Sequence, residues 1–259
     1  MDLGLKGKRA LVTGSSSGLG AAAALTLAME GVDVTINGRD RERLQKAGDD
    51  IFGATGRRPR LAIGDVTKAE EIQRIVQEAG AIDILVSNAG GPPPGDFLQH
   101  APERWQEAAD LVLNSAVRLT RAVIEGMKSR GWGRLIYITS VGVLQPIDNL
   151  ILSNTFRAGV TGFCKTISNN YARYGITANC VCPGYTATDR LWDLARKTAA
   201  ATGQTAGAVM ESFAASNPAG RVGKPDELAA LITFLASEKA AYITGTSIPI
   251  DGGLVKALI

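Results

Sequence analysis

Residues 8–20 decide the fold of this chain, and they read Lys8-Arg9-Ala10-Leu11-Val12-Thr13-Gly14-Ser15-Ser16-Ser17-Gly18-Leu19-Gly20. The apolar run from Ala10 to Val12 has the length and composition of a buried strand. The run breaks at Gly14, and helix-forming residues follow from Leu19 through Ala28. The stretch therefore predicts a strand, a glycine-rich turn and a helix within about 20 residues.

The glycines of this turn are spaced G-x-x-x-G-x-G. In a turn of this kind one glycine bends the chain tightly, one lets backbone N–H groups approach a pyrophosphate, and one lets the helix pack close to the strand. The helix N-terminus adds unpaired N–H groups and a partial positive charge. An ordinary Gly/Ser turn is the alternative. We interpret the stretch as the start of a dinucleotide-binding βαβ unit, with the expected contacts Gly14, Ser16, Ser17, Gly18, Leu19 and Gly20.

Length and composition indicate one soluble α/β domain spanning residues 1–259. The net charge is only +3, and no dense Lys/Arg block occurs, so we expect neither a nucleic-acid partner nor a membrane surface. The N-terminus lacks the apolar core of a signal peptide. The three cysteines form no C-x-x-C pair, which argues against a disulfide framework or a metal site. Together these features predict a cytoplasmic protein.

Strand-like and helix-like segments alternate along the chain. Strands are predicted over 10–12, 32–36, 60–63, 82–87, 134–139, 177–181 and 247–249. Helices are predicted over 19–28, 41–52, 68–79 (with Thr67 as N-cap), 102–127, 153–174 and 226–235, with a polar helical insertion over 186–216. The alternation predicts a single-domain Rossmann-type fold, a doubly wound, mostly parallel seven-stranded sheet with helices on both faces. Ligands of such sheets lie beyond the carboxyl ends of the strands.

The end of the second predicted strand bears on the choice of cofactor. An acid there would bind the adenosine ribose hydroxyls and repel a 2′-phosphate. This chain has Asn37-Gly38-Arg39 instead, and the guanidinium of Arg39 suits a phosphate group. Asp40 follows one residue late, where its charge could pair with Arg41 or Arg43. We therefore expect NADP rather than NAD, with a solvated Arg39 as the alternative.

Threonine followed by this glycine spacing, at Thr13–Gly20, resembles the short-chain dehydrogenase/reductase family, and the chain is similar to its 3-oxoacyl-ACP reductase-like members over about residues 5–253. The resemblance implies hydride transfer between a nicotinamide cofactor and a small-molecule carbonyl or alcohol. It also implies a homotetramer or homodimer, and a substrate lid at the insertion over 186–216.

The resemblance also assigns cofactor contacts to loops that follow the predicted strands. Asp65 and Val66 would contact the adenine. The motif Asn88-Ala89-Gly90 would steady the sheet and line the cofactor, although Asn88 could be a simple turn cap. The loop Pro183-Gly184 would flank the nicotinamide, and Thr186 or Thr188 would bond its carboxamide.

The catalytic pattern of the family is broken in this chain. Asn114 and Ser140 stand where the family has its asparagine and serine. Thirteen residues after Ser140, where the family has its acid/base tyrosine, stands Ser153, and four residues later Arg157 replaces the lysine. A serine hydroxyl is a far weaker acid than a phenol, and arginine does not deprotonate in proteins. Arg157 would still hold the ribose and stabilise an oxyanion, but a helix face without catalytic role is the alternative for Ser153 and Arg157.

Three functions remain open from the sequence. The first is an NADP-dependent oxidoreductase with an altered proton route, shared by the four residues above or served by a tyrosine such as Tyr185. The second is a catalytically weak NADP-binding protein with a regulatory or assembly role. The third is a non-redox lyase resembling the halohydrin dehalogenases, which also carry arginine in place of the lysine. We interpret His100, and the basic residues Arg190, Arg196 and Lys197, as solvated surface residues.

Overall fold

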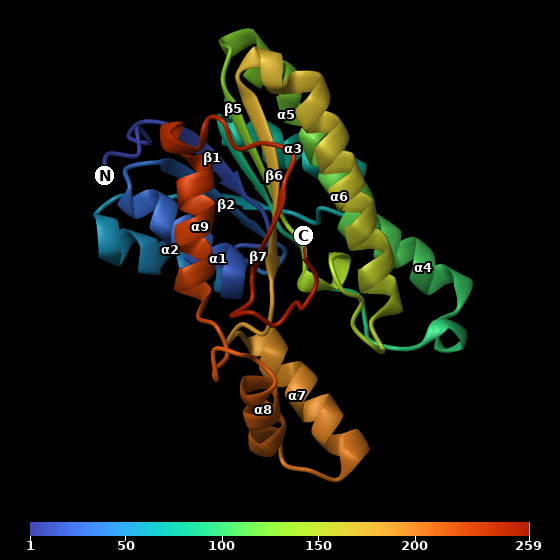
Figure 1. The fold of residues 1–259 in the computed structure, drawn as a ribbon. Coiled ribbons are helices and arrows are strands. Elements are labelled where there is room, and N and C mark those ends of the chain that lie inside the picture. Colours follow the sequence, from blue (N-terminus) through green and yellow to red (C-terminus); the bar gives the residue numbers. More distant parts are fainter. Residues whose placement is uncertain (259) are drawn as a thin grey trace.

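A computed structural model describes residues 1–258 of the chain. Seven parallel strands form one sheet in the order β3-β2-β1-β4-β5-β6-β7 (Figure 1). The bounds of the strands are β1 Arg9–Val12, β2 Asp33–Gly38, β3 Arg60–Ile63, β4 Ile84–Ser87, β5 Gly133–Ile138, β6 Ile176–Pro183 and β7 Ser247–Ile250. The strand order reverses between β1 and β4, which is where such sheets open a crevice for a ligand. The predicted fold class is confirmed.

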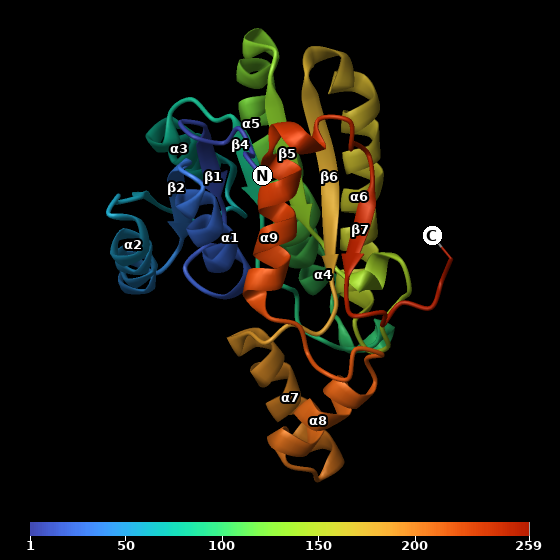
Figure 2. The same ribbon diagram turned by 60° about the vertical axis from the view of Figure 1, so that its left-hand side comes forward.

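Helices cover both faces of the sheet, as the two views in Figures 1 and 2 show. One face carries α1 (Gly18–Met29), α2 (Arg41–Thr55) and α9 (Pro225–Ala236). The other carries α3 (Ala69–Ala79), α5 (Ser115–Arg130) and α6 (Ile151–Tyr171), with α4 (Pro102–Ala109) leading towards α5. A separate pair, α7 (Asp189–Thr202) and α8 (Ala206–Ala215), projects beyond the carboxyl end of the sheet. No helix within residues 1–258 combines the length and the apolar character needed to cross a membrane.

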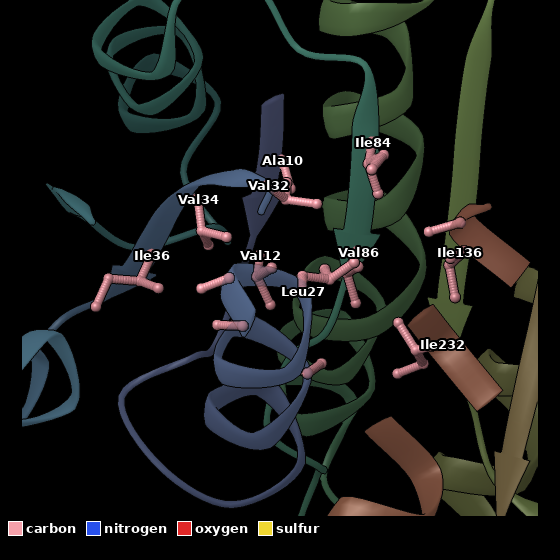
Figure 3. Packing of buried hydrophobic residues seen from close by; sticks show 14 of the residues in the cluster. Ala10, Val12, Leu27, Val32, Val34, Ile36, Ile84, Val86, Ile136 and Ile232 are labelled. Atoms are coloured by element: carbon pink, nitrogen blue, oxygen red, sulfur yellow. The ribbon is translucent and has the colours of Figure 1, made fainter. Parts of the chain in front are cut away.

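The alternation of side chains along each strand divides the core into two layers. Ala10 and Val12 of β1 pack with α1 and α9, while Leu11 belongs to the opposite layer, under α3 and α5. Figure 3 shows the first layer, where Leu27 and Ile232 meet the strands. Burial on both faces is what an all-parallel sheet requires, and it explains the continuous apolar runs of the sequence.

Several predicted helix limits were wrong. The helix predicted over 102–127 is interrupted by a π-helical turn, Asp110–Asn114, which packs against α6. Thr67 is not an N-cap, because its backbone N–H donates to Asp65 Oδ1 in a turn and α3 begins only at Ala69. The insertion is two helices, since a left-handed Gly203 ends α7 and the Thr205 side chain caps α8.

His100 was wrongly interpreted as a surface residue. Its imidazole is half-buried against Gly95, and its Nε2 atom is enclosed without a hydrogen-bond partner in residues 1–258. The backbone of Gly95 pairs with the segment Asn149–Leu150, so the loop after β4 lies beside the loop after β5. These two paired loops form a wall next to the carboxyl ends of the central strands.

Candidate active site at the carboxyl ends of the strands

The glycine-rich turn between β1 and α1 has the geometry of a phosphate cradle. Gly14 and Gly18 have φ angles of 56° and 59°, a region that favours glycine. A Cβ on Gly20 would lie 2.3 Å from the carbonyl oxygen of Gly14, so only glycine allows α1 to pack this close to the turn. Ser17 precedes α1 without capping it through its side chain, and the first turn carries no acid. The N-terminus of α1 therefore presents uncapped N–H groups and an uncompensated positive end, which fits the diphosphate of a dinucleotide.

Asn88 fixes the loop after β4 against this cradle. Its Nδ2 donates to the carbonyl oxygen of Gly14 at 2.9 Å. The Thr13 hydroxyl donates to the carbonyl oxygen of Asn88 at 2.8 Å and accepts from its N–H at 3.0 Å. Of the next residues, Ala89 is half-buried and Gly90 is exposed. A Cβ on Gly90 would meet no atom within 4 Å. Asn88 is thus a bridge between the two central strands rather than a simple turn cap.

The ends of β2 and β3 meet where an adenosine would lie. A Cβ on Gly38 would lie 3.2 Å from Ser16 Cβ, so glycine lets β2 approach the cradle. Arg39 Nη1 lies 3.6 Å from Asp65 Oδ2, and 78% of the Arg39 side chain is exposed. Burial alone would raise the pKa of Asp65, but hydrogen bonds from Thr67 and the charge of Arg39 outweigh it and hold that pKa below its usual value. The ionised carboxylate can accept from an amine, which suits the expected adenine contact.

The sequence interpretation missed a second cation at this end of the site. Arg43, in the first turn of α2, donates from Nη2 to Ser17 Oγ at 3.3 Å and lies 3.7 Å from Asp189. Asp40 is the N-cap of α2 and accepts from the backbone N–H of Arg43. The signal was available, because a helix that follows β2 directs its first-turn side chains towards the carboxyl ends of the strands.

The Pro183-Gly184 turn ends β6 close to β7. A Cβ on Gly184 would lie 2.8 Å from Asp251 Cβ, so this approach needs glycine. Thr186 is buried, and its hydroxyl donates to the carbonyl oxygen of Gly184 at 3.3 Å. Thr188 is the N-cap of α7, and its Cγ2 would lie 3.5 Å from a Cβ on Gly18. The start of the α7–α8 pair therefore lies against the phosphate cradle.

Ser153 and Arg157 are brought together on one face of α6. Arg157 Nε donates to Ser153 Oγ at 3.2 Å, and its Nη1 donates to the carbonyl oxygens of Ile138 and Thr139 at 2.8 and 3.0 Å. Burial, together with the charge of Arg190, lowers the pKa of Arg157 to about 10. The guanidinium is therefore a cation at neutral pH, held at the carboxyl end of β5.

The other two expected catalytic residues make different contacts. Ser140 Oγ accepts from the backbone N–H of Gly142 at 3.1 Å and caps a short turn after β5. Asn114 Nδ2 donates to Asp110 Oδ1 at 2.9 Å within the π-helical turn. Within residues 1–258, neither Ser140 nor Asn114 hydrogen-bonds to Ser153 or Arg157. The π-helical turn still lies beside the site, since Leu113 packs 3.2 Å from a Cβ position on Gly159 of α6, and such turns occur frequently at functional sites.

The nearby tyrosines are poor substitutes for the missing phenol. Tyr185 stacks on Phe213 of α8 with 4.4 Å between ring centroids, and burial raises its pKa. Tyr137 is buried in β5 with its hydroxyl 2.8 Å from Thr120 Oγ1, and burial raises its pKa far above the usual value. A raised pKa makes a hydroxyl a weaker acid, so neither tyrosine is tuned for proton donation near neutral pH.

Arg190, which the sequence analysis interprets as solvated, is exposed, but it makes contacts that the sequence did not predict. From the first turn of α7 its Nη1 and Nη2 donate to the carbonyl oxygens of Gly91 and Pro92 at 3.1 and 3.3 Å. A Cβ on Gly91 would lie 2.0 Å from Arg190 Nη2, so glycine is what admits the guanidinium here. Arg196 is also exposed, but it is paired with Asp193 and forms no hydrogen bond with this loop in residues 1–258.

The three cysteines are buried and free, and Cys180 and Cys182 lie on the same face of β6. Burial raises the pKa of the Cys182 thiol to about 11, which leaves it protonated and unreactive near neutral pH. Within residues 1–258, no three His, Cys, Asp or Glu side chains converge as ligands of a metal ion would. The chemical groups at the site are thus the cradle, the carboxyl-end amides and hydroxyls, and the guanidinium groups.

Comparison of the whole chain with known proteins identifies similar enzymes. A family model described as "Enoyl-(Acyl carrier protein) reductase" matches residues 14–255. The chain is 36% identical to 3-oxoacyl-(acyl-carrier-protein) reductase FabG of Escherichia coli (strain K12) over 97% of this chain and 99% of the relative. It is 35% identical to D-beta-hydroxybutyrate dehydrogenase of Cupriavidus necator, again over 97% and 99% of the two chains.

A solved structure of an oxidoreductase is also similar to this chain. The L-sorbose reductase of Gluconobacter frateurii, complexed with NADPH and L-sorbose, matches with a TM-score of 0.95 at 33% identity over 100% of both chains. These relatives and neighbours are oxidoreductases, and they align with this chain from end to end. The chain therefore belongs to the short-chain dehydrogenase/reductase family.

Proposed function

We propose that this protein is an NADP(H)-dependent oxidoreductase that reduces a carbonyl or oxidises a secondary alcohol with an altered proton route. The proposal depends on the N-terminus of α1, which has no side-chain cap and follows a turn whose geometry requires glycine. The Arg157 guanidinium lies at the carboxyl end of β5 in the same site. The similarity to FabG and to the NADPH complex of L-sorbose reductase supports the same reaction class.

The chain's own residues divide the binding task among the strand ends. The N–H groups of the cradle hold the diphosphate, Asp65 and Val66 receive the adenine, and Thr186 or Thr188 receives the carboxamide. Arg157 holds the ribose hydroxyls. When bound, the reduced nicotinamide supplies a hydride to the carbonyl carbon, while the carbonyl oxygen gains a proton.

The proton route is the unusual part of the proposal. As negative charge develops on the substrate oxygen, the buried cation Arg157 stabilises it without giving up its own proton. The hydroxyls of Ser153 and Ser140, with a water molecule held near Asn114, then relay a proton from solvent. A positioned acid typically contributes about 10²–10⁴-fold to a rate, so we expect turnover below that of a tyrosine-containing enzyme.

We propose NADP as the preferred cofactor because two cations border the adenosine end and no acid occupies position 38. Arg39 and Arg43 both lie at the carboxyl end of β2, and the charge of Arg39 is only partly matched by Asp65 at 3.6 Å. A 2′-phosphate placed here would meet guanidinium groups, whereas the ribose hydroxyls of NAD would find no carboxylate at Gly38.

We further propose that residues 186–216, the α7–α8 segment, act as a substrate lid, because Thr188 at its start lies against Gly18 of the cradle. Half-exposed Ile248 and Ile250 on edge strand β7 support assembly into a homotetramer or homodimer. Three buried, free cysteines are compatible with the proposed cytoplasmic location.

Two measurements test the proposed function. NADPH fluorescence titration should show saturable binding, tighter than for NADH, and a panel of ketones should show slow oxidation of NADPH. If NADPH binds but no ketone is turned over, the protein is better described as a catalytically weak cofactor-binding protein. This is the second candidate function, because neither Tyr137 nor Tyr185 has a pKa suited to proton donation. If neither nucleotide binds, the proposal is contradicted, and the halohydrin dehalogenase-like lyase is the remaining candidate. That candidate is the least favoured one, because this chain does not share the rebuilt nucleotide loop of those lyases.

A further inference from the structure

Two guanidinium groups reach the same loop of the candidate site from different elements. Arg157 on α6 lines a small cavity together with Ala89 and Gly90. Arg190 on α7 donates to the carbonyl oxygens of the next residues, Gly91 and Pro92. The two cations therefore lie beside consecutive residues of one loop, and the charge of Arg190 lowers the pKa of Arg157. The loop after β4 thus has one guanidinium beside each of its halves.

Neither cation forms an ion pair with a carboxylate in the described chain. Within residues 1–258, no ion pair within 4 Å includes Arg157 or Arg190. Desolvation of its guanidinium lowers the pKa of Arg190 and the charge of Asp193 opposes that shift, but the Asp193 carboxylate is ion-paired with Arg196 at 2.5 Å. Bringing two cations together in a partly desolvated site is costly unless an anion joins them. Such an arrangement is stabilised when a ligand supplies the missing negative charge.

Both guanidinium groups keep donors for that anion. The hydrogen bonds of Arg157 use Nε and Nη1, so its Nη2 donates to no acceptor in residues 1–258. The hydrogen bonds of Arg190 use Nη1 and Nη2, and its Nε remains available. The backbone carbonyls hold each fork in place, and a guanidinium fork matches the two oxygens of a carboxylate.

We propose that Arg157 and Arg190 together bind a carboxylate of the substrate, so that the substrate is an oxo acid in the reducing direction and a hydroxy acid in the oxidising direction. This inference rests on the proposed function and narrows its substrate class. In the proposed function the N–H groups of the cradle hold the diphosphate, and Arg39 and Arg43 border the 2′-phosphate, so the phosphates do not require this pair. Arg157 Nη2 has two N–H bonds, one for the ribose hydroxyls and one for the substrate carboxylate. In the reaction the carboxylate is unchanged, one hydride adds to the carbonyl carbon and one proton from solvent adds to its oxygen.

The test compares acids with their neutral methyl esters. Pyruvate, acetoacetate and levulinate place the carboxylate at increasing distance from the carbonyl, and each has a methyl ester of nearly the same shape. We expect kcat/KM with NADPH to favour at least one acid over its ester. Arg190→Gln should lower that acid's kcat/KM by roughly 10- to 100-fold, mostly through KM, and lower the ester's far less, as the loss of a charged hydrogen bond predicts. Arg196→Gln, one helical turn and a half away on α7, is the matched control and should change neither substrate.

A binding measurement keeps this inference separate from the proposed function. With NADP⁺ bound, thermal unfolding should shift upward with an acid and not with its ester, and Arg190→Gln should abolish the shift while its NADP⁺ affinity is kept. If no carbonyl is turned over, the proposed function fails, and an acid-specific shift would still support the carboxylate site. Equal kcat/KM for all acids and esters, an equal loss for both in Arg190→Gln, or no acid-specific shift would overturn the inference.

Discussion

Ser153 and Arg157 lie one helical turn apart on α6, and we propose that they replace the family's tyrosine and lysine with a pair of different acidity. The hydrogen bond of 3.2 Å between them shows that α6 brings the two side chains together on one face. What is missing is a hydroxyl whose pKa a neighbouring cation could bring towards neutrality. A phenol begins near a pKa of about 10, and an alkyl hydroxyl lies far above it.

The double variant Ser153→Tyr with Arg157→Lys therefore tests the register directly. We expect it to raise kcat for ketone reduction by roughly 10²–10⁴-fold, the contribution of a positioned acid. Ser153→Phe with Arg157→Lys is the control, since it adds the same ring without the hydroxyl. Steady-state NADPH oxidation gives the result, and thermal unfolding shows that each variant is folded. No gain over the control, with NADPH still bound, would mean that the pocket serves another chemistry.

The cradle glycines permit a sharper test. Gly20→Ala would place a Cβ 2.3 Å from the carbonyl oxygen of Gly14, a backbone atom that cannot move aside without opening the turn. We expect the variant to weaken NADPH binding by at least tenfold and to lower Tm, as measured by fluorescence titration and calorimetry. Gly53→Ala, on exposed α2 with no atom within 4 Å, is the control and should stabilise by about 1 kcal/mol with unchanged NADPH affinity. Unchanged affinity in Gly20→Ala would show that the cradle does not hold the cofactor.

Arg39 decides the cofactor preference if the 2′-phosphate lies at the end of β2. Arg39→Gln removes one charge-assisted hydrogen bond and should raise the Kd for NADPH by roughly 10- to 100-fold while leaving the Kd for NADH nearly unchanged. Arg41→Gln, on the same side of Gly38 but without a contact to the cradle, is the control. Parallel titrations with the two nucleotides provide the measurement. An equal effect on both would assign Arg39 to a role other than phosphate recognition.

At the scale of elements, periodicity located every strand and most helices of the described chain. Apolar runs such as Ile84–Ser87 are strands buried on both faces, and local composition reports this directly. Local composition could not report the π-helical turn Asp110–Asn114, because it depends on packing against α6. Nor could it separate α7 from α8 without the capping roles of Gly203 and Thr205.

The residues of the candidate site also fall into those that local sequence predicted and those that it could not predict. Backbone features, such as the cradle and the Asn88 bridge, follow from motifs whose residues lie close in the sequence. Arg43 and Arg190 were missed because long side chains extend from the first turns of helices to loops far away in the chain. Spacing alone led to the proposal that Ser153 and Arg157 replace the family's tyrosine and lysine, but it could not predict the contacts of Arg157 with the carboxyl end of β5.

The α7–α8 pair has a small core of its own, which separates its stability from that of the sheet. Ala195, Ala199 and Val209 are buried together and form a cluster apart from the two main layers. Val209→Asp should therefore release α7 and α8 locally, raising KM for the substrate and removing amide hydrogen-exchange protection there while the strands stay protected. Ser212→Asp, exposed on α8, is the charge-matched control. Loss of protection throughout the sheet would show that the pair is part of the global core.

At the scale of the whole molecule, the candidate active site and an ion-pair cluster lie at opposite ends of the sheet. Asp83, just before β4, accepts from Arg9 Nε at 2.9 Å and from Arg130 Nε at 3.0 Å, and thereby joins β1, β4 and the end of α5. Burial alone would raise the pKa of Asp83, but the hydrogen bonds and charges of the two arginines hold it below its usual value. The stability from this cluster should therefore be independent of the cofactor.

Asp83→Asn should lower the free energy of unfolding at neutral pH by about 3 kcal/mol, because it leaves two cations sharing a neutral partner. Since the folded-state pKa of Asp83 is depressed, its contribution is fully present above the unfolded value of about 4 and is lost as pH falls through the folded value. Urea unfolding at several pH values should thus show the gap between wild type and variant closing below a pH of about 4, with NADPH affinity equal at neutral pH. Asp49→Asn, which removes the exposed partner of Arg58, should leave stability nearly unchanged. A gap that stayed constant with pH would assign the loss to packing rather than to the charge of Asp83.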